Sequence, residues 1–118
     1  MNEIKLKRIY DAPDSDDGVR ILVDRLWPRG LSKESANLDL WLKDLAPSNE
    51  LRKWYNHDPE KWPQFRDDYF NELNQKQELI RSLLAKIEES NVTFLFSNKH
   101  RENNNAVALK LYLEQYIQ

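Results

Sequence analysis

VRILVDRLWPRG, the stretch Val19–Gly30, decides the fold. Its first part carries the aliphatic residues Val19, Ile21, Leu22 and Val23, which are of the kind found in a strand buried in a parallel sheet. The run stops at a group of charged and rigid residues that begins with Asp24 and ends with Arg29. Because α/β proteins bind ligands at the carboxyl ends of such strands, the stretch predicts an α/β fold with a binding site after this strand. It names no reaction.

The composition indicates one globular domain over residues 1–118. With 118 residues the chain is long enough for a single core and too short for two. Hydrophobic residues make up 40% and charged residues 32%, which excludes the disordered and fibrous classes. A net charge of -2 argues against a general nucleic-acid binder, although a local basic patch is compatible with it. The absence of Cys excludes disulfides and thiolate metal sites.

The first residues, MNEIKLKRIY, alternate charged and apolar residues instead of forming the continuous apolar region of a signal peptide. No later stretch approaches the length that spans a membrane. We therefore expect a cytoplasmic protein without membrane association. The alternation over residues 4–10 also predicts a strand with one wetter face, which suits an edge of the sheet.

The segment DAPDSDDG, residues 11–18, is acidic and rich in turn residues. A calcium-binding loop fails on spacing, because counting back from Gly18 puts Pro13 and Ser15 where the first two acidic ligands belong. We expect a solvated loop.

Helical spacing dominates the middle of the chain. Residues 32–45 carry Leu and Trp at helical intervals, which predicts an amphipathic helix ending before Pro47. Ser48 is placed to cap a second helix, and two further helical faces follow with a break near Asn74.

The apolar run Val92–Phe96 is the second strong strand prediction, and it directly follows a helix. A polar stretch and a closing helix come after it, so the chain repeats the order strand, polar loop, helix. This order predicts a small, largely parallel sheet flanked by helices, with both polar loops at one edge. That edge would bring together six polar residues: Asp24, Arg25, Arg29, Ser97, Lys99 and Asn104.

Several segments resemble a known family. They are LVDRLWPRG at residues 22–30, ELRKWY at residues 50–55, FRDDYFNEL at residues 65–73, and FLFSNK leading into NNAVALKLYL. These segments are similar to the YeaO-like proteins, grouped as domain of unknown function 488. The resemblance implies a small α/β fold and a bacterial or archaeal cytoplasmic protein, and it carries no activity with it.

Carried over residue by residue, the polar positions characteristic of that family fall on Asp24, Arg25, Trp27, Pro28, Arg29, Gly30, Ser97, Lys99 and Asn104. One position departs from the pattern. The family often has Asn-His-Ala at the start of the last helix, whereas this chain has Asn104, Asn105 and Ala106. The departure argues against a mechanism that uses an imidazole there.

The chemistry of the edge residues favours an anionic ligand. A guanidinium presents a planar fork to phosphate or carboxylate, so Arg25 and Arg29 together with Lys99 predict an anion site. Asp24 would orient one of these Arg side chains, or act as a catalytic general base. In the alternative reading, Asp24 and one Arg pair only to satisfy the end of a buried strand, while Trp27 packs underneath.

Other chemistry has weaker support. Ser97 lacks the glycine elbow of a nucleophile, so a turn or capping role is favoured. Trp27 would either stack on a base or cover the sheet edge. His57 and His100 lie far apart in the sequence, and no His or carboxylate cluster has metal-ligand spacing, so we expect no metal other than Mg²⁺ arriving with a nucleotide.

Three hypotheses follow, and the cofactor and oligomeric state stay open. The first is a binding module or enzyme for a small anionic ligand, phosphate or a nucleotide. Its ligand-binding candidates are Arg25, Trp27, Arg29, Ser97, Lys99 and Asn104, with Asp24 as the candidate catalytic residue. The second is a non-catalytic interaction or regulatory domain in which the same cluster is structural. The third, local nucleic-acid contact through Lys99, His100 and Arg101, is the weakest because of the overall charge.

Overall fold

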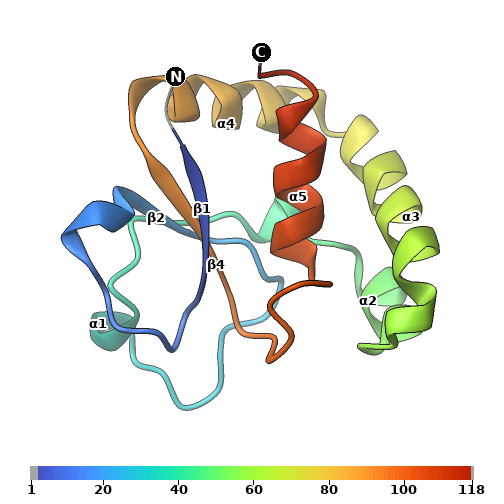
Figure 1. The fold of residues 1–118 in the computed structure, drawn as a ribbon, viewed down its shortest axis with the longest axis horizontal. Helices are drawn as coiled ribbons and strands as arrows, with labels where there is room; N and C mark the ends of the chain where they lie inside the picture. The colour runs from blue at the N-terminus through green and yellow to red at the C-terminus, as the bar shows by residue number, and fades with distance from the viewer. Residues whose placement is uncertain (1–2, 118) are drawn as a thin grey trace.

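A four-stranded sheet forms the centre of the molecule (Figure 1). All strand pairs are parallel, in the order β1-β4-β2-β3. The strands are β1 (Ile4–Arg8), β2 (Val19–Leu22), β3 (Leu40–Trp41) and β4 (Val92–Phe96). The computed structural model describes residues 3–117. The predicted α/β fold with a small parallel sheet is confirmed.

Helices cover the sheet. They are α1 (Lys33–Ala36), α2 (Asn49–Tyr55), α3 (Trp62–Asn74), α4 (Gln77–Glu89) and α5 (Asn105–Glu114), with short 3-10 turns at Ser15–Asp17, Lys43–Leu45 and Pro59–Lys61. Figure 1 shows α5 against the sheet and α3 on its outer side. No helix within residues 3–117 has the length and apolar character needed to cross a bilayer.

Both faces of the sheet are buried, which explains the consecutive apolar residues at positions 21–23 and 94–96 in and after its central strands. Ile21 and Phe94 point into the main core beneath α3, α4 and α5. Leu22 and Leu95, one residue further along each strand, point to the opposite face and pack with Ile9 in a second, smaller cluster. The alternation follows from the two-residue period of a strand.

The predicted helix over residues 32–45 is wrong. The helix that starts there, α1, ends at Ala36 because Asn37 adopts a left-handed conformation with φ of 50°. The Asp39 carboxylate then accepts a hydrogen bond from the Arg20 backbone N–H at 2.8 Å, and Leu40–Trp41 pairs with β2 as a strand. The spacing of Leu38, Trp41, Leu42 and Leu45 fits a helix, and a strand of two residues is too short to produce a periodic pattern of its own.

The predicted solvated loop over residues 11–18 is wrong at its end. Asp17 is only 3% exposed, and its carboxylate binds Lys7 Nζ at 3.0 Å and Arg20 Nη1 at 2.5 Å. Its backbone oxygen accepts a hydrogen bond from Thr93 Oγ1 at 2.7 Å. Burial by itself would raise the pKa of Asp17, but the hydrogen bonds from Lys7, the Asp14 N–H and Arg20 outweigh it and lower that pKa.

We call Lys7, Asp17, Arg20 and Thr93 the amino-end cluster, since it lies where β2 begins.

Four other predictions about the secondary structure are confirmed. The first strand lies at an edge of the sheet, Ser48 caps α2, the break near Asn74 separates α3 from α4, and β4 follows α4 as a parallel crossover.

Candidate functional site

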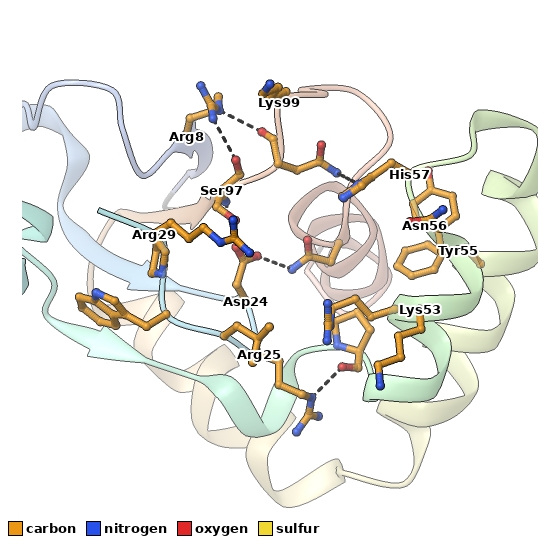
Figure 2. A pocket seen from close by; sticks show the side chains of 18 of the residues that line it. Arg8, Asp24, Arg25, Arg29, Lys53, Tyr55, Asn56, His57, Ser97 and Lys99 are labelled. Carbon is orange, nitrogen blue, oxygen red and sulfur yellow. Dashed lines mark hydrogen bonds between the residues drawn. The ribbon is translucent and has the colours of Figure 1, made fainter. Parts of the chain in front are cut away.

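A cavity of about 760 Å³ opens at the carboxyl ends of β2 and β4. We call it the edge cavity. One wall follows the strands and the other is the end of α2 (Figure 2). Its lining includes Arg8, Tyr10, Asp24, Arg25, Trp27, Arg29, Arg52, Lys53, Tyr55, Asn56, His57, Ser97, Lys99 and Asn105. The predicted gathering of polar residues at one edge of the sheet is therefore observed, although two of the six residues have other roles.

Asp24 lies at the base of the edge cavity and joins three elements. Its Oδ2 accepts hydrogen bonds from the Ser97 backbone N–H at 2.9 Å and from Ser97 Oγ at 2.8 Å. Its Oδ1 accepts from Asn105 Nδ2 at 3.0 Å, and the same amide donates to the Val23 carbonyl oxygen at 2.9 Å. The carboxylate thus ties the ends of β2 and β4 to the start of α5.

Arg25 turns away from the middle of the edge cavity. Its Nε donates to the Pro47 carbonyl oxygen at 2.9 Å and its Nη2 to the Ala46 carbonyl oxygen at 3.1 Å. Figure 2 shows this guanidinium directed toward the segment that precedes α2. Arg25 therefore holds in place the segment that leads into α2.

Basic side chains dominate the edge cavity. Six Lys or Arg residues line it, against the single carboxylate of Asp24. The whole chain, by contrast, carries a net charge of -2. Arg8 donates to the carbonyl oxygens of Ser97 and Asn98 at 2.9 and 3.0 Å, so its head group is engaged.

Three of the six basic side chains have no partner among residues 3–117. The Arg29 guanidinium and the ammonium groups of Lys53 and Lys99 make no hydrogen bond or salt bridge with any residue from 3 to 117. We call them the unpaired cations. In Figure 2, Arg29 extends toward the middle of the cavity from the strand side, while Lys53 lies on the α2 side and Lys99 at the loop after β4.

The α2 wall has an unusual backbone. Asn56 and His57, which follow α2, are both left-handed, with φ of 44° and 59°. Outside glycine this conformation is uncommon, and it often occurs at ligand sites. Asn98 Nδ2 donates to His57 Nδ1 at 3.0 Å, and the Tyr55 hydroxyl donates to the Asn103 carbonyl oxygen at 2.8 Å. These two bonds hold the end of α2 against the loop after β4.

Trp27 and Asn104 have clear structural roles. The Trp27 indole N–H donates to the Leu31 carbonyl oxygen at 2.7 Å, and its ring meets Trp41 edge to face at a centroid distance of 5.4 Å. Asn104 is fully buried and does not line the edge cavity. It caps α5, accepting from the Val107 N–H at 3.0 Å and donating to the His100 carbonyl oxygen at 2.8 Å.

Sequence reasoning missed the α2 wall, that is Arg52, Lys53, Asn56 and His57. The available signal was the basic pair within ELRKWY, followed directly by polar residues at the end of a capped helix. His57 and His100, far apart in the sequence, come close enough for their ring centroids to lie 6.4 Å apart. Over residues 3–117 no group of three or more His, Cys, Asp or Glu side chains is arranged to hold a metal ion.

Comparison with known proteins assigns the chain to a family. A family model described as "Inactive DUF488-N3 subclade" matches residues 3–118. The Escherichia coli (strain K12) protein named Uncharacterized protein YeaO is 40% identical over 110 residues, which cover 93% of this chain and 96% of that protein. Uncharacterized protein Rv3073c of Mycobacterium tuberculosis (strain ATCC 25618 / H37Rv) is 39% identical over 108 residues, or 90% of this chain and 89% of that protein. No solved structure matches the chain. The chain belongs to the YeaO-like DUF488 family, within the subclade described as inactive.

Proposed function

We propose that this protein binds a small phosphate-bearing ligand, either phosphate or a nucleotide, in the edge cavity and does not transform it. The unpaired cations carry the proposal. Three positive side chains on the wall of one cavity repel one another unless an anion lies between them, and the only carboxylate in the lining is Asp24. Arg29 adds the planar fork that suits a phosphate, and the two Lys residues add point charges.

The size and apolar part of the edge cavity suit a ligand larger than a bare ion. Its volume of about 760 Å³ falls in the range of roughly 300–1,000 Å³ that is typical of small-molecule sites. Tyr10, Leu26 and Trp27 also line the cavity, and the Tyr10 hydroxyl donates to the Arg29 carbonyl oxygen at 2.9 Å. A nucleotide would place its phosphate against the cations and its ring against these side chains.

Three observations support binding without turnover. Neutral donors already occupy both oxygens of Asp24, so we assign it a positioning role and not the expected catalytic one. His57 Nδ1 accepts a hydrogen bond from Asn98, so the lone pair of that nitrogen is already engaged and does not face a ligand. Asn105, at the position where the resemblance implies His, carries an amide that cannot take up a proton. The matching family model is described as inactive, which agrees with this assignment.

The structural alternative accounts well for part of the cluster. Asp24 and Arg25 are both bound within the chain, and they would be needed in a domain that has no ligand. It does not account for Arg29, Lys53 and Lys99, whose charges satisfy nothing in residues 3–117. The two hypotheses therefore differ at these three side chains. A cytoplasmic location remains a prediction.

The test is calorimetric titration with phosphate, sulfate, AMP and ATP. The variants are Arg29→Met and Lys53→Met, with Arg81→Met as a matched control, because Arg81 is exposed on α4 and lines no part of the edge cavity. A charged hydrogen bond contributes about 1.5–3 kcal/mol, so each cavity variant should bind at least roughly tenfold more weakly than wild type.

Two outcomes would contradict the proposal. If no anion binds, or if Arg81→Met weakens binding as much as the cavity variants do, the edge cavity is not the anion site. If chromatography of an overnight incubation shows that the bound nucleotide has been converted, the protein is an enzyme and the proposed absence of turnover is wrong.

A further inference from the structure

A second cavity, of about 400 Å³, adjoins the edge cavity. Tyr55, His57 and Lys99 line both cavities. The remaining lining residues of the second cavity are Pro59, His100, Arg101, Glu102 and Asn103. A ligand seated in the edge cavity can therefore extend past His57 and Lys99 into the second cavity without leaving the protein surface.

Lys99 occupies the junction between the cavities. Its ammonium is one of the unpaired cations, and Figure 2 shows it at the loop after β4, on the side of the edge cavity that carries Arg8 and Ser97. His57, also at the junction, is held in its left-handed conformation with φ of 59° and is fixed by the hydrogen bond from Asn98. Outside glycine such a conformation persists only where the surroundings enforce it, and it is found often at ligand sites.

The second cavity offers hydrogen-bond donors that have no partner in the described part of the chain. The His100 ring lies near His57, with 6.4 Å between centroids, and neither of its nitrogens is hydrogen-bonded to another residue in the 3–117 range. Arg101 is engaged, because its Nη1 and Nη2 donate to the two carboxylate oxygens of Asp11 at 2.8 and 3.0 Å. Glu102 is the one carboxylate in the lining. An anion entering this cavity would thus meet Lys99 and two imidazoles.

Building on the proposed function, we infer that the ligand carries a second phosphate linked to the first, and that this second group lies in the second cavity against Lys99 and His100. The ligand class is a molecule with a chain of at least two phosphates. Inorganic pyrophosphate and nucleoside diphosphates share this chemistry. A single phosphate would occupy the edge cavity and leave the donors of the second cavity without a partner.

The experiment compares ligands that differ by one phosphate. Phosphate and pyrophosphate form one pair, AMP and ADP the other, and each is titrated calorimetrically into wild type, His100→Ala and Glu102→Gln, with Arg81→Met as the control. His100 and Glu102 are both exposed, and within residues 3–117 the side chain of His100 makes only a ring contact with His57, so both variants should fold.

The expected result is a selective change. Wild type binds the diphosphate member of each pair about tenfold more tightly than the monophosphate member. His100→Ala removes most of that gain without altering monophosphate affinity, and Glu102→Gln enlarges it because a repelling carboxylate is gone. A gain for pyrophosphate but not for ADP would identify the free inorganic ion as the ligand, and a larger gain for ADP would identify a nucleotide.

The outcomes separate the two proposals. If monophosphates bind with the expected dependence on Arg29 and Lys53 but His100→Ala leaves the diphosphate gain intact, the second cavity is not used and this inference is wrong while the proposed function stands. If wild type binds neither member of either pair, both fail.

Discussion

The two ends of the parallel sheet differ in whether their charged side chains have partners within the described part of the chain. In the amino-end cluster, Asp17 and Arg20 are 3% and 4% exposed, and each makes several hydrogen bonds within the chain. At the carboxyl end, the edge cavity leaves Arg29, Lys53 and Lys99 without partners in the described part of the chain. Both ends of the sheet carry charged side chains. Those of the amino-end cluster are paired with one another, whereas the three unpaired cations at the carboxyl end have no partner within residues 3–117.

The difference separates structural charges from charges available to a ligand. A buried ion pair that lost one member would leave an uncompensated charge, so each charged member of the amino-end cluster should contribute to the stability of the fold. An exposed cation without a partner contributes little to stability and can be kept for another purpose. Substitutions at the amino end should therefore change stability, and substitutions of the unpaired cations should change anion affinity.

Arg20→Met should have the largest effect on stability. It leaves the buried Asp17 carboxylate with Lys7 as its only basic partner and removes the donors to the Asn37 and Ala36 carbonyl oxygens. Breaking a buried pair costs about 3–5 kcal/mol of unfolding free energy, which urea denaturation would measure. Arg29→Met is the matched control and should change stability by no more than about 0.5 kcal/mol. Equal losses for the two variants would remove the distinction between the two ends.

Asp24→Asn should lower stability by about 2 kcal/mol, since an amide that replaces the carboxylate cannot accept from Ser97 and Asn105 at both of its ends. Anion affinity should stay the same or rise, because the variant removes the only carboxylate in the lining of the edge cavity. The measurements are urea denaturation and phosphate titration. A loss of binding without a loss of stability would return Asp24 to a direct role toward the ligand.

The sequence predicted the carboxyl end better than the amino end. The two apolar strands and the polar residues after them have a strong period and a known geometric consequence, so the contact between Asp24 and Ser97 followed from topology. Asp17 lay in a run of acidic and turn residues whose composition is that of a solvated loop. Its burial depends on Lys7 and Arg20, which come from two different strands, and no local pattern records that pairing.

The role of each edge residue could not be predicted from sequence. Arg25 and Arg29 are four positions apart in one loop, yet the first binds the carbonyl oxygens of Ala46 and Pro47 while the second is unpaired. Which guanidinium finds backbone acceptors depends on where the segment before α2 passes, and that follows from the short strand β3 that the helical interpretation missed. Lys53 and His57 were missed for the same reason, because the position of α2 was not known.

The acid sensitivity of the amino-end cluster has a definite sign. The folded state holds the pKa of Asp17 below its ordinary value of 3.8, so this carboxyl stabilises the fold above about pH 4 and the contribution is lost as pH falls through the lower folded-state value. Asp17→Asn should be less stable than wild type at neutral pH, and the gap should narrow as pH falls below about 4. Urea midpoints measured from pH 6 down to about pH 2.5 would show it. A gap that stays constant with pH would mean that the charge of Asp17 adds nothing to stability.

The smallest effect is expected from Arg101→Gln, which makes the comparison sharper because it breaks the same kind of ion pair in a different environment. Arg101 and Asp11 form an ion pair joined by two hydrogen bonds. Unlike Asp17 and Arg20, their side chains are 57% and 31% exposed. The hydrogen bond from Arg101 lowers the pKa of Asp11, and the variant should let that pKa rise toward its ordinary value in an NMR titration. Water already screens this exposed pair, so the urea midpoint should shift only slightly compared with the shift for Arg20→Met. A loss as large as that of Arg20→Met would show that burial does not decide which charges the fold requires.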